Sequence, residues 1–175
     1  MGLIQSYVRP VGGFQSDTYV DVPTGALAAT VVASTLGGAN VAHLQRFRVA
    51  RSITISKLGV YIGATSAGNV DAGIYTSDGT TWTRIAANGG TPAGTASTMQ
   101  ELSLTATVTL VPGIDYWAAF VGSDGTLTVG RVNASLGNWS GHGNRVISKA
   151  SSYPLPSTIT SPAKAAHVVA MLLVV

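Results

Sequence analysis

Groups that could carry acid–base or nucleophilic chemistry are sparse in this sequence of 175 residues, which has 7 Asp and Glu, 3 His and no Cys. Asp78, Asp115 and Asp124 lie in or next to turn sequences, where a carboxylate usually accepts hydrogen bonds from nearby backbone amides. Asp71 follows Asn69-Val70 at the entry of a predicted strand. A calcium-binding loop that uses Asp71, Asp78 and Asp124 is an alternative.

The sequence contains no recognisable group of metal-ligating or catalytic residues. The histidines, His43, His142 and His167, are far apart, and none has a second ligand at helical or hairpin spacing. The absence of cysteine excludes disulfides, thiolate metal sites and cysteine nucleophiles. No Gly-x-Ser-x-Gly motif is present. We therefore predict a protein that is not an enzyme and that has no cofactor or metal.

Aromatic side chains are the remaining candidates for ligand binding, because sugars stack on exposed aromatic faces. Tyr75, Trp82, Trp139 and Tyr153 could form such a platform, and we take Trp82, Trp139 and Tyr153 as the candidate ligand-binding residues. For Trp82 and Trp139 the alternative is packing in the core or at a subunit interface. Trp117 lies within an apolar run, so we expect it in the core.

The basic residues do not predict a nucleic-acid site. The formal net charge of +3 comes from 10 Lys and Arg and 7 acidic residues spread thinly along the chain. Arg46, Arg48 and Arg51 come closest to a cluster. Arg46 and Arg48 alternate with Phe47 and Val49, which is typical of a half-buried strand. We expect no nucleic-acid partner.

No membrane segment or secretion signal is predicted. The most apolar stretch, residues 167–175, is much shorter than the roughly 20 residues of a membrane-spanning helix. Residues 1–10 lack a basic region followed by a long apolar core. We therefore expect synthesis in the cytoplasm and no membrane partner.

Composition and periodicity together predict an all-β protein. Hydrophobic residues make up 46% of the chain and charged residues only 10%, and Glu101 is its single glutamate, so the long polar residues of helix surfaces are scarce. Residues 53–62 alternate, with a change of phase across Ser56-Lys57 that predicts a bulge. Residues 70–76 and 82–85 form a predicted hairpin around Asp78-Gly79.

The remaining chain divides into strands and irregular segments. Further strands are predicted at 99–110, 115–121, 126–132 and 165–175, and an exposed loop at 88–94. Residues 133–164 are rich in Asn, Gly, Ser and Pro and show little periodicity. We expect an N-terminal arm over residues 1–40, with a strand near 18–22, and one β-sandwich domain over residues 41–175.

The order of these features resembles the jelly-roll β-sandwich domains of virion proteins in tailed bacteriophages, both head decoration proteins and tail or fibre proteins. Short, degenerate motifs carry the resemblance, which spans roughly residues 18–175. They are Thr18-Tyr19-Val20, residues 42–49, residues 53–62, residues 66–75, residues 110–119 and Tyr153-Pro154-Leu155-Pro156.

The resemblance implies a structural protein of the virion with an antiparallel jelly-roll fold, a loose N-terminal arm and a long irregular segment before the last strand. It also implies a homotrimer that contacts the major capsid protein or tail proteins. The expected assembly contacts are Tyr7, Phe14, Tyr19, Trp139, His142 and Tyr153. A carbohydrate-binding or host-adsorption module that binds a host-surface glycan through Trp82, Trp139 and Tyr153 is the alternative.

Overall fold

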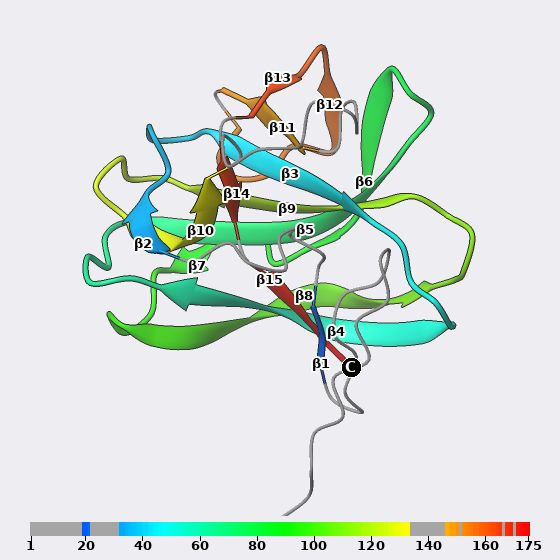
Figure 1. Ribbon diagram of the computed structural model, residues 1–175, viewed down its shortest axis with the longest axis horizontal. Helices are drawn as coiled ribbons and strands as arrows, with labels where there is room; N and C mark the ends of the chain where they lie inside the picture. Colours follow the sequence, from blue (N-terminus) through cyan, green and yellow to red (C-terminus); the bar gives the residue numbers. More distant parts are fainter. Residues whose placement is uncertain (1–18, 22–31, 134–145, 151, 166, 170) are drawn as a thin grey trace, which may run out of the picture.

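The computed structural model describes residues 19–21, 32–133, 146–150, 152–165, 167–169 and 171–175. These ranges contain fifteen strands and no helix, hence no helix that could span a membrane. The strands form two facing sheets in which every pairing is antiparallel (Figure 1). The prediction of an all-β fold is confirmed at this level.

The first sheet has seven strands. They are β1 (Tyr19–Asp21), β2 (Val32–Thr35), β4 (Ile53–Ile62), β8 (Thr98–Leu110), β10 (Thr128–Asn133), β14 (His167–Val169) and β15 (Met171–Val174). The second sheet has eight. They are β3 (Ala42–Phe47), β5 (Asn69–Ser77), β6 (Thr81–Ala87), β7 (Thr91–Pro92), β9 (Tyr116–Gly122), β11 (Val146–Lys149), β12 (Thr158–Thr160) and β13 (Ala163–Lys164).

The second sheet curls until its two ends nearly meet. Its strand order is β12-β6-β5-β9-β3-β11-β13, and the strands at the two ends, β12 and β13, are separated in sequence only by Ser161 and Pro162. The Lys149 ammonium of β11 donates to the Thr160 carbonyl of β12 over 3.0 Å, which links the two ends. The orange strands at the top of Figure 1 show this closure.

Because the second sheet curls, it packs against a hydrophobic core on each of its faces. The first core lies between the two sheets and includes Leu58, Val60, Ile62, Ile74, Phe120 and Leu127. The second core lies inside the curled sheet and includes Leu44, Tyr75, Trp82, Trp117, Leu155 and Ile159.

Strand β9 is central because it supplies side chains to both cores. Tyr116, Ala118 and Phe120 face the first core, whereas Trp117, Ala119 and Val121 face the second. A strand buried on both faces reads as a continuous apolar run. The predicted strand over residues 115–121 and the prediction of a buried Trp117 are both confirmed.

The predicted bulge and hairpin are also confirmed. In the β4–β8 pairing the register shifts between Ile55 and Lys57, and residues 104–107 of β8 lie opposite Ser56. The β5–β6 hairpin turns at Asp78 and Gly79, where the φ of Gly79 is +98°. Glycine is favoured there because other residues rarely adopt such a φ.

Other predicted boundaries are wrong in detail. Residues 165–175 do not form one strand: β14 pairs with β10, whereas β15 pairs with β1 and β4. The segment 88–94 contains β7, which pairs with Asn69 and Val70 of β5. Residues 133–164 contain β11, β12 and β13. These strands are too short for alternation of polar and apolar residues to reveal them. Near residues 18–22, β1 confirms the expected strand.

Truncating a central side chain tests the first core. We expect Phe120→Ala, at a fully buried position of β9, to lower the free energy of unfolding by about 3–5 kcal/mol, because it leaves a cavity between the sheets. The measurement is urea unfolding followed by tryptophan fluorescence. Thr83→Ala, at an exposed position of β6, is the control and should cost less than about 1 kcal/mol. Equal losses for the two variants would contradict the burial of Phe120 between the sheets.

Candidate functional site

Two of the three candidate ligand-binding aromatics belong to the second core. Trp82 is only 7% exposed, and its ring meets that of Trp117 edge-on, with a centroid distance of 5.5 Å and an interplanar angle of 84°. Tyr153 is half-buried and packs against the same cluster. Since a stacking platform needs an open ring face, Trp82 is not part of one, which leaves its core-packing alternative.

The other aromatic predictions are not addressed by the described part of the chain. Tyr7, Phe14, Trp139 and His142 lie outside the described residues, and Tyr19 is described only as a backbone position of β1. Their assignment as assembly contacts, and that of Trp139 as a ligand-binding residue, stays a prediction.

A buried polar cluster surrounds Asp71 on β5. The Asp71 side chain is fully buried, and its two oxygens accept hydrogen bonds from the backbone N–H groups of Gly89 and Leu155, each over 2.9 Å. Asp71 thus binds one backbone donor 18 residues later in the sequence and another 84 residues later. Asp71 lies near the start of its strand, as predicted, and its carboxylate faces the inside of the curled sheet because both faces of β5 are covered.

Neighbouring side chains hold the same segment, residues 152–157, on the sheet. The Tyr75 hydroxyl donates to the Pro156 carbonyl over 2.6 Å, and the Arg84 guanidinium donates to the Leu155 carbonyl. The backbone N–H of Arg84 donates to the Ser157 carbonyl over 2.8 Å. Three side chains of the β5–β6 hairpin therefore fix residues 152–157 through their backbone.

Gly73 provides the space that this arrangement needs. It lies between Asp71 and Tyr75 on the same face of β5, and a Cβ atom there would come within 2.7 Å of the Ala86 carbonyl and 3.2 Å of Leu155. The segment can thus pack directly on the backbone of β5. A glycine inside a strand commonly marks such a close approach.

The electrostatics of this cluster favour a structural role. Burial raises the pKa of Tyr75, and the Asp71 carboxylate adds to the effect, so the hydroxyl keeps its proton and acts as a donor. Burial and Asp71 likewise raise the pKa of Tyr153. Both oxygens of Asp71 are occupied by backbone donors. These groups therefore serve to position residues 152–157.

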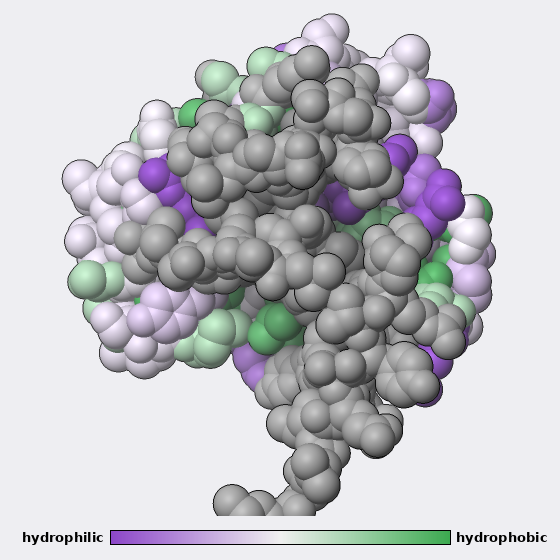
Figure 2. Space-filling model, viewed as in Figure 1, coloured by the Kyte–Doolittle hydropathy of each residue, from purple (hydrophilic) through white to green (hydrophobic). Residues whose placement is uncertain are grey.

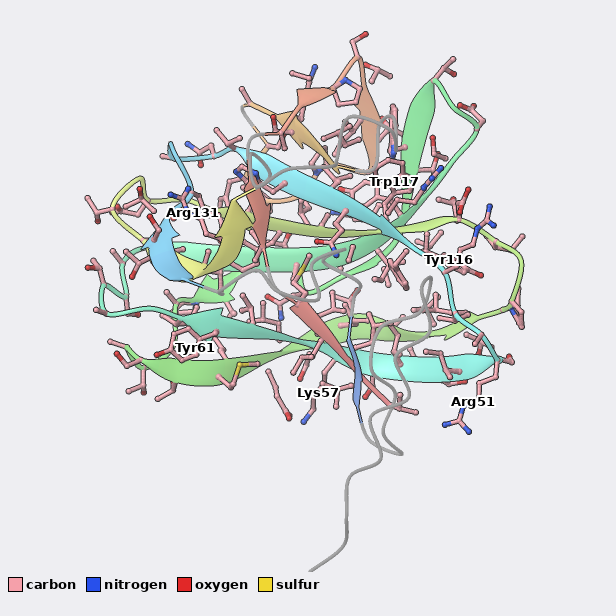
Figure 3. The ribbon with its side chains drawn as sticks, in the orientation of Figure 1. Arg51, Lys57, Tyr61, Tyr116, Trp117 and Arg131 are labelled. Carbon is pink, nitrogen blue, oxygen red and sulfur yellow. The ribbon has the colours of Figure 1, made fainter. Side chains whose placement is uncertain are left out.

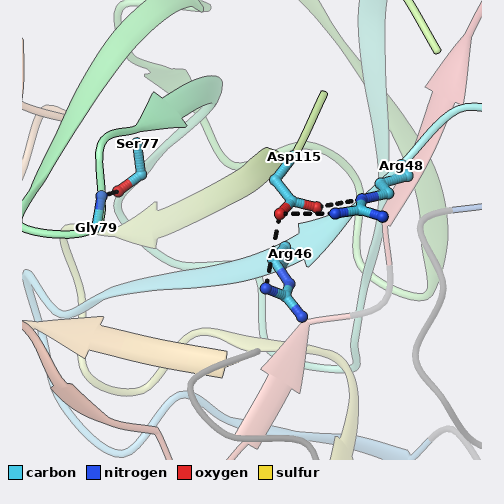
Figure 4. A network of polar contacts seen from close by, with 5 residues as sticks. All are labelled: Arg46, Arg48, Ser77, Gly79 and Asp115. Carbon is cyan, nitrogen blue, oxygen red and sulfur yellow. Dashed lines mark hydrogen bonds and ion pairs between the residues drawn. The ribbon is translucent and has the colours of Figure 1, made fainter. Parts of the chain in front are cut away.

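An exposed ionic cluster joins β3 to the chain just before β9 (Figure 4). The Arg48 guanidinium binds both oxygens of Asp115, with an Nη2–Oδ2 distance of 3.1 Å, and Arg46 approaches the same carboxylate at 3.7 Å. The hydrogen bond from Arg48 to Asp115 and the negative charge of Asp115 raise the pKa of Arg48. Asp115 was expected to cap its own turn, and this expectation is wrong because the carboxylate reaches across to β3.

The β8–β9 connection, residues 111–115, is held at both ends while its tip projects. The backbone N–H of Val111 donates to the Tyr116 hydroxyl over 3.0 Å, and Asp115 is bound by the arginines. Between them, Pro112 and Gly113 make the turn, with a φ of +85° at Gly113. Val111 and Ile114 are 41% and 44% exposed, so two apolar side chains stand on a fixed loop.

The turn aspartates behave as predicted. Asp78 accepts from the backbone N–H groups of Thr80 and Thr81, and Asp124 accepts from that of Thr126. These hydrogen bonds lower the pKa of both carboxyl groups. Within the described ranges, no group of three or more His, Asp or Glu could hold a metal ion, so the calcium alternative has no site there.

Comparisons with known proteins leave the function to be argued from the molecule itself. No protein-family model, curated protein or solved structure matches the chain.

The hydrogen bonds of Asp71 can be tested with an isosteric substitution. We expect Asp71→Asn to lower the free energy of unfolding by about 2–4 kcal/mol, because one side-chain oxygen becomes an NH2 group facing a backbone donor. Urea unfolding measures the loss, and hydrogen exchange should show faster exchange of the Leu155 amide. Asp78→Asn, in an exposed turn, is the matched control and should leave the Leu155 amide protected. Unchanged protection in Asp71→Asn would contradict the assigned role.

Alkaline pH tests the burial of Tyr75. Because its pKa is higher in the folded protein than in the unfolded chain, where it is about 10, its contribution to stability is complete below that pH and is lost as the pH rises above it. We expect Tyr75→Phe to reduce this alkaline loss and to cost about 1 kcal/mol at neutral pH. The measurement is urea unfolding at about pH 8 and about pH 11. Tyr61→Phe, on the outer face of the first sheet, should retain the wild-type decline.

Proposed function

We propose that this chain is a non-enzymatic structural component of a tailed-phage virion, in which it acts through contacts with neighbouring subunits. The observation that carries the proposal is the β8–β9 connection, which presents Val111 and Ile114 next to Arg46 and Arg48 on a backbone fixed at both ends. Protein interfaces are enriched in arginine together with large apolar side chains.

The immobilised backbone supports an assembly role further. Ordering a loop at an interface costs free energy on association, so a loop that is already held binds with a smaller penalty. Here the Tyr116 hydroxyl and the two arginines hold the loop before any partner arrives. The exposed apolar side chains are thus presented in one conformation.

The polar cluster around Asp71 also suits a rigid particle component. Asp71, Tyr75 and Arg84 use their polar atoms to fix residues 152–157 to the second sheet. These contacts connect distant parts of one chain and make a rigid body. The glycan-binding alternative is weakened because Trp82 is enclosed in the second core.

We also propose a jelly-roll topology and a trimeric assembly for this chain. Two facing antiparallel sheets agree with the jelly-roll sandwich that the sequence resemblance implies. We propose that the chain forms a homotrimer and contacts the major capsid protein or tail proteins, as a head decoration protein or as part of the tail or its fibre.

Purified particles test the proposed function directly. Particles from the natural source of the chain would be isolated by density gradient and analysed by quantitative mass spectrometry. We expect the chain to band with the major capsid protein in a fixed ratio that survives a second gradient. Light scattering of the isolated protein should give three times the mass of one chain. Absence from the particle band, with the chain recovered only in the free fraction, would contradict the proposal.

A further inference from the structure

Strand register brings two connections together at one end of the molecule. The β3–β9 pairing extends to Tyr116 and the β4–β8 pairing to Leu110, so the segments beyond these pairs, the β3–β4 and β8–β9 connections, meet there. We call five arginine and apolar residues of this end, which are exposed or half-buried, the arginine-loop surface. It consists of Arg46, Arg48, Arg51, Val111 and Ile114.

The surface combines strongly polar and apolar groups. Figure 2 shows hydrophilic and hydrophobic residues next to each other at the right-hand edge of the molecule, where Figure 1 places the β8–β9 connection. The side chains of Arg46 and Arg48 are 33% and 57% exposed. Arg51, just before β4, points away from the ribbon at the same end (Figure 3).

The charges on this surface do not balance. The guanidinium groups of Arg46 and Arg48 contact the carboxylate of Asp115, and Arg51 adds a third positive charge at the same end. Asp78, on the neighbouring β5–β6 hairpin, already accepts three hydrogen bonds within its own turn. Three arginines against the two carboxylates of Asp115 and Asp78 leave this end with a net positive charge. Asp115 holds Arg48 in a fixed orientation, and the guanidinium groups of Arg46 and Arg51 stay accessible to a further anionic group.

We propose that the arginine-loop surface binds an acidic segment with apolar side chains on a different protein, and not a second copy of this chain. The inference rests on the proposed assembly function and identifies the chemistry of the partner. Carboxylates of the partner would pair with the arginines, while its apolar side chains would cover Val111 and Ile114.

Charge complementarity argues against a second copy. Two arginine-loop surfaces facing each other would repel, and the whole chain has a net charge of +3. The carboxylate groups that the structure describes are already engaged: Asp71 with backbone amides, Asp78 and Asp124 in turns, Glu101 with Lys57, and Asp115 with the arginines. We therefore assign the complementary carboxylates to another protein.

The apolar side chains argue for a polypeptide and against a simple polyanion. Val111 and Ile114 lie on both sides of the Pro112-Gly113 turn, next to the ionic cluster. A phosphate backbone or a sulfated polysaccharide would pair with the arginines and leave these two side chains uncovered. A peptide segment with carboxylates and apolar residues matches both parts of the surface.

The test uses the full chain and a defined probe. Fluorescently labelled random poly(Glu,Tyr) supplies carboxylates and aromatic rings, and poly-Glu, heparin and duplex DNA supply charge alone. Binding would be measured by fluorescence anisotropy for the wild-type chain, Arg48→Glu and Ile114→Ser. The matched control is Lys57→Glu, which makes the same charge change on β4, away from this surface. Urea unfolding confirms that each variant folds.

We expect the wild-type chain to bind poly(Glu,Tyr) at least tenfold more tightly than poly-Glu. Arg48→Glu and Ile114→Ser should each weaken that binding about tenfold or more, whereas Lys57→Glu should change it less than threefold. Equal affinity for heparin or DNA, equal losses in Lys57→Glu, or no binding to poly(Glu,Tyr) would overturn the proposal.

A second measurement separates this inference from the proposed function. A photo-crosslinking amino acid at position 114 would be introduced into the chain in intact particles, with position 83 on β6 as the control site. We expect crosslinks from position 114 to an acidic segment of another protein, and crosslinks to a second copy would overturn the inference. If the chain is absent from particles, the proposed function fails, while the binding experiment still decides the chemistry of the surface.

Discussion

The carboxylate of Asp71 is the contact on which the second half of the fold depends. Without ionic or hydrogen-bonded partners, a buried charge costs several kcal/mol, so this position is tolerated only because both oxygens accept backbone hydrogen bonds. Those two bonds connect the β6–β7 loop and residues 152–157 to the first part of β5. They hold the segment that carries Leu155 into the second core, and they account for how the curled sheet keeps its interior closed.

Double burial of β9 links the two halves of the molecule. Its alternate side chains enter both cores, so any shift of its register would move Phe120 and Trp117 at the same time. The side chains at the start of β9 extend this rigidity to the surface. Tyr116 packs against Phe47 and accepts a hydrogen bond from Val111, and Asp115 binds the arginines of β3. The exposed loop is fixed because it adjoins the most constrained strand.

Local patterns predicted much of the fold but little of the polar chemistry. The β4 bulge, the Asp78-Gly79 hairpin and the apolar run of β9 could be predicted because each depends on neighbouring residues. The role of Asp71 could not be predicted, because one of its two hydrogen-bond donors, the Leu155 backbone N–H, is 84 residues away in sequence. Asp115 was misassigned for the same reason: Arg48 is 67 residues away and becomes its neighbour only through strand pairing.

Near-closure of the second sheet has a consequence for how molecules of this kind avoid unwanted association. An open sheet edge exposes unpaired N–H and C=O groups, to which a strand of another chain can add. In the second sheet the strands at the two ends, β12 and β13, turn toward each other and are joined by two residues. In the first sheet, β8 is a long strand at one end that pairs only with β4 among the described strands. Growth by strand addition is therefore disfavoured where the curled sheet nearly closes, whereas the 13-residue β8 leaves a long, Thr-rich edge open to it.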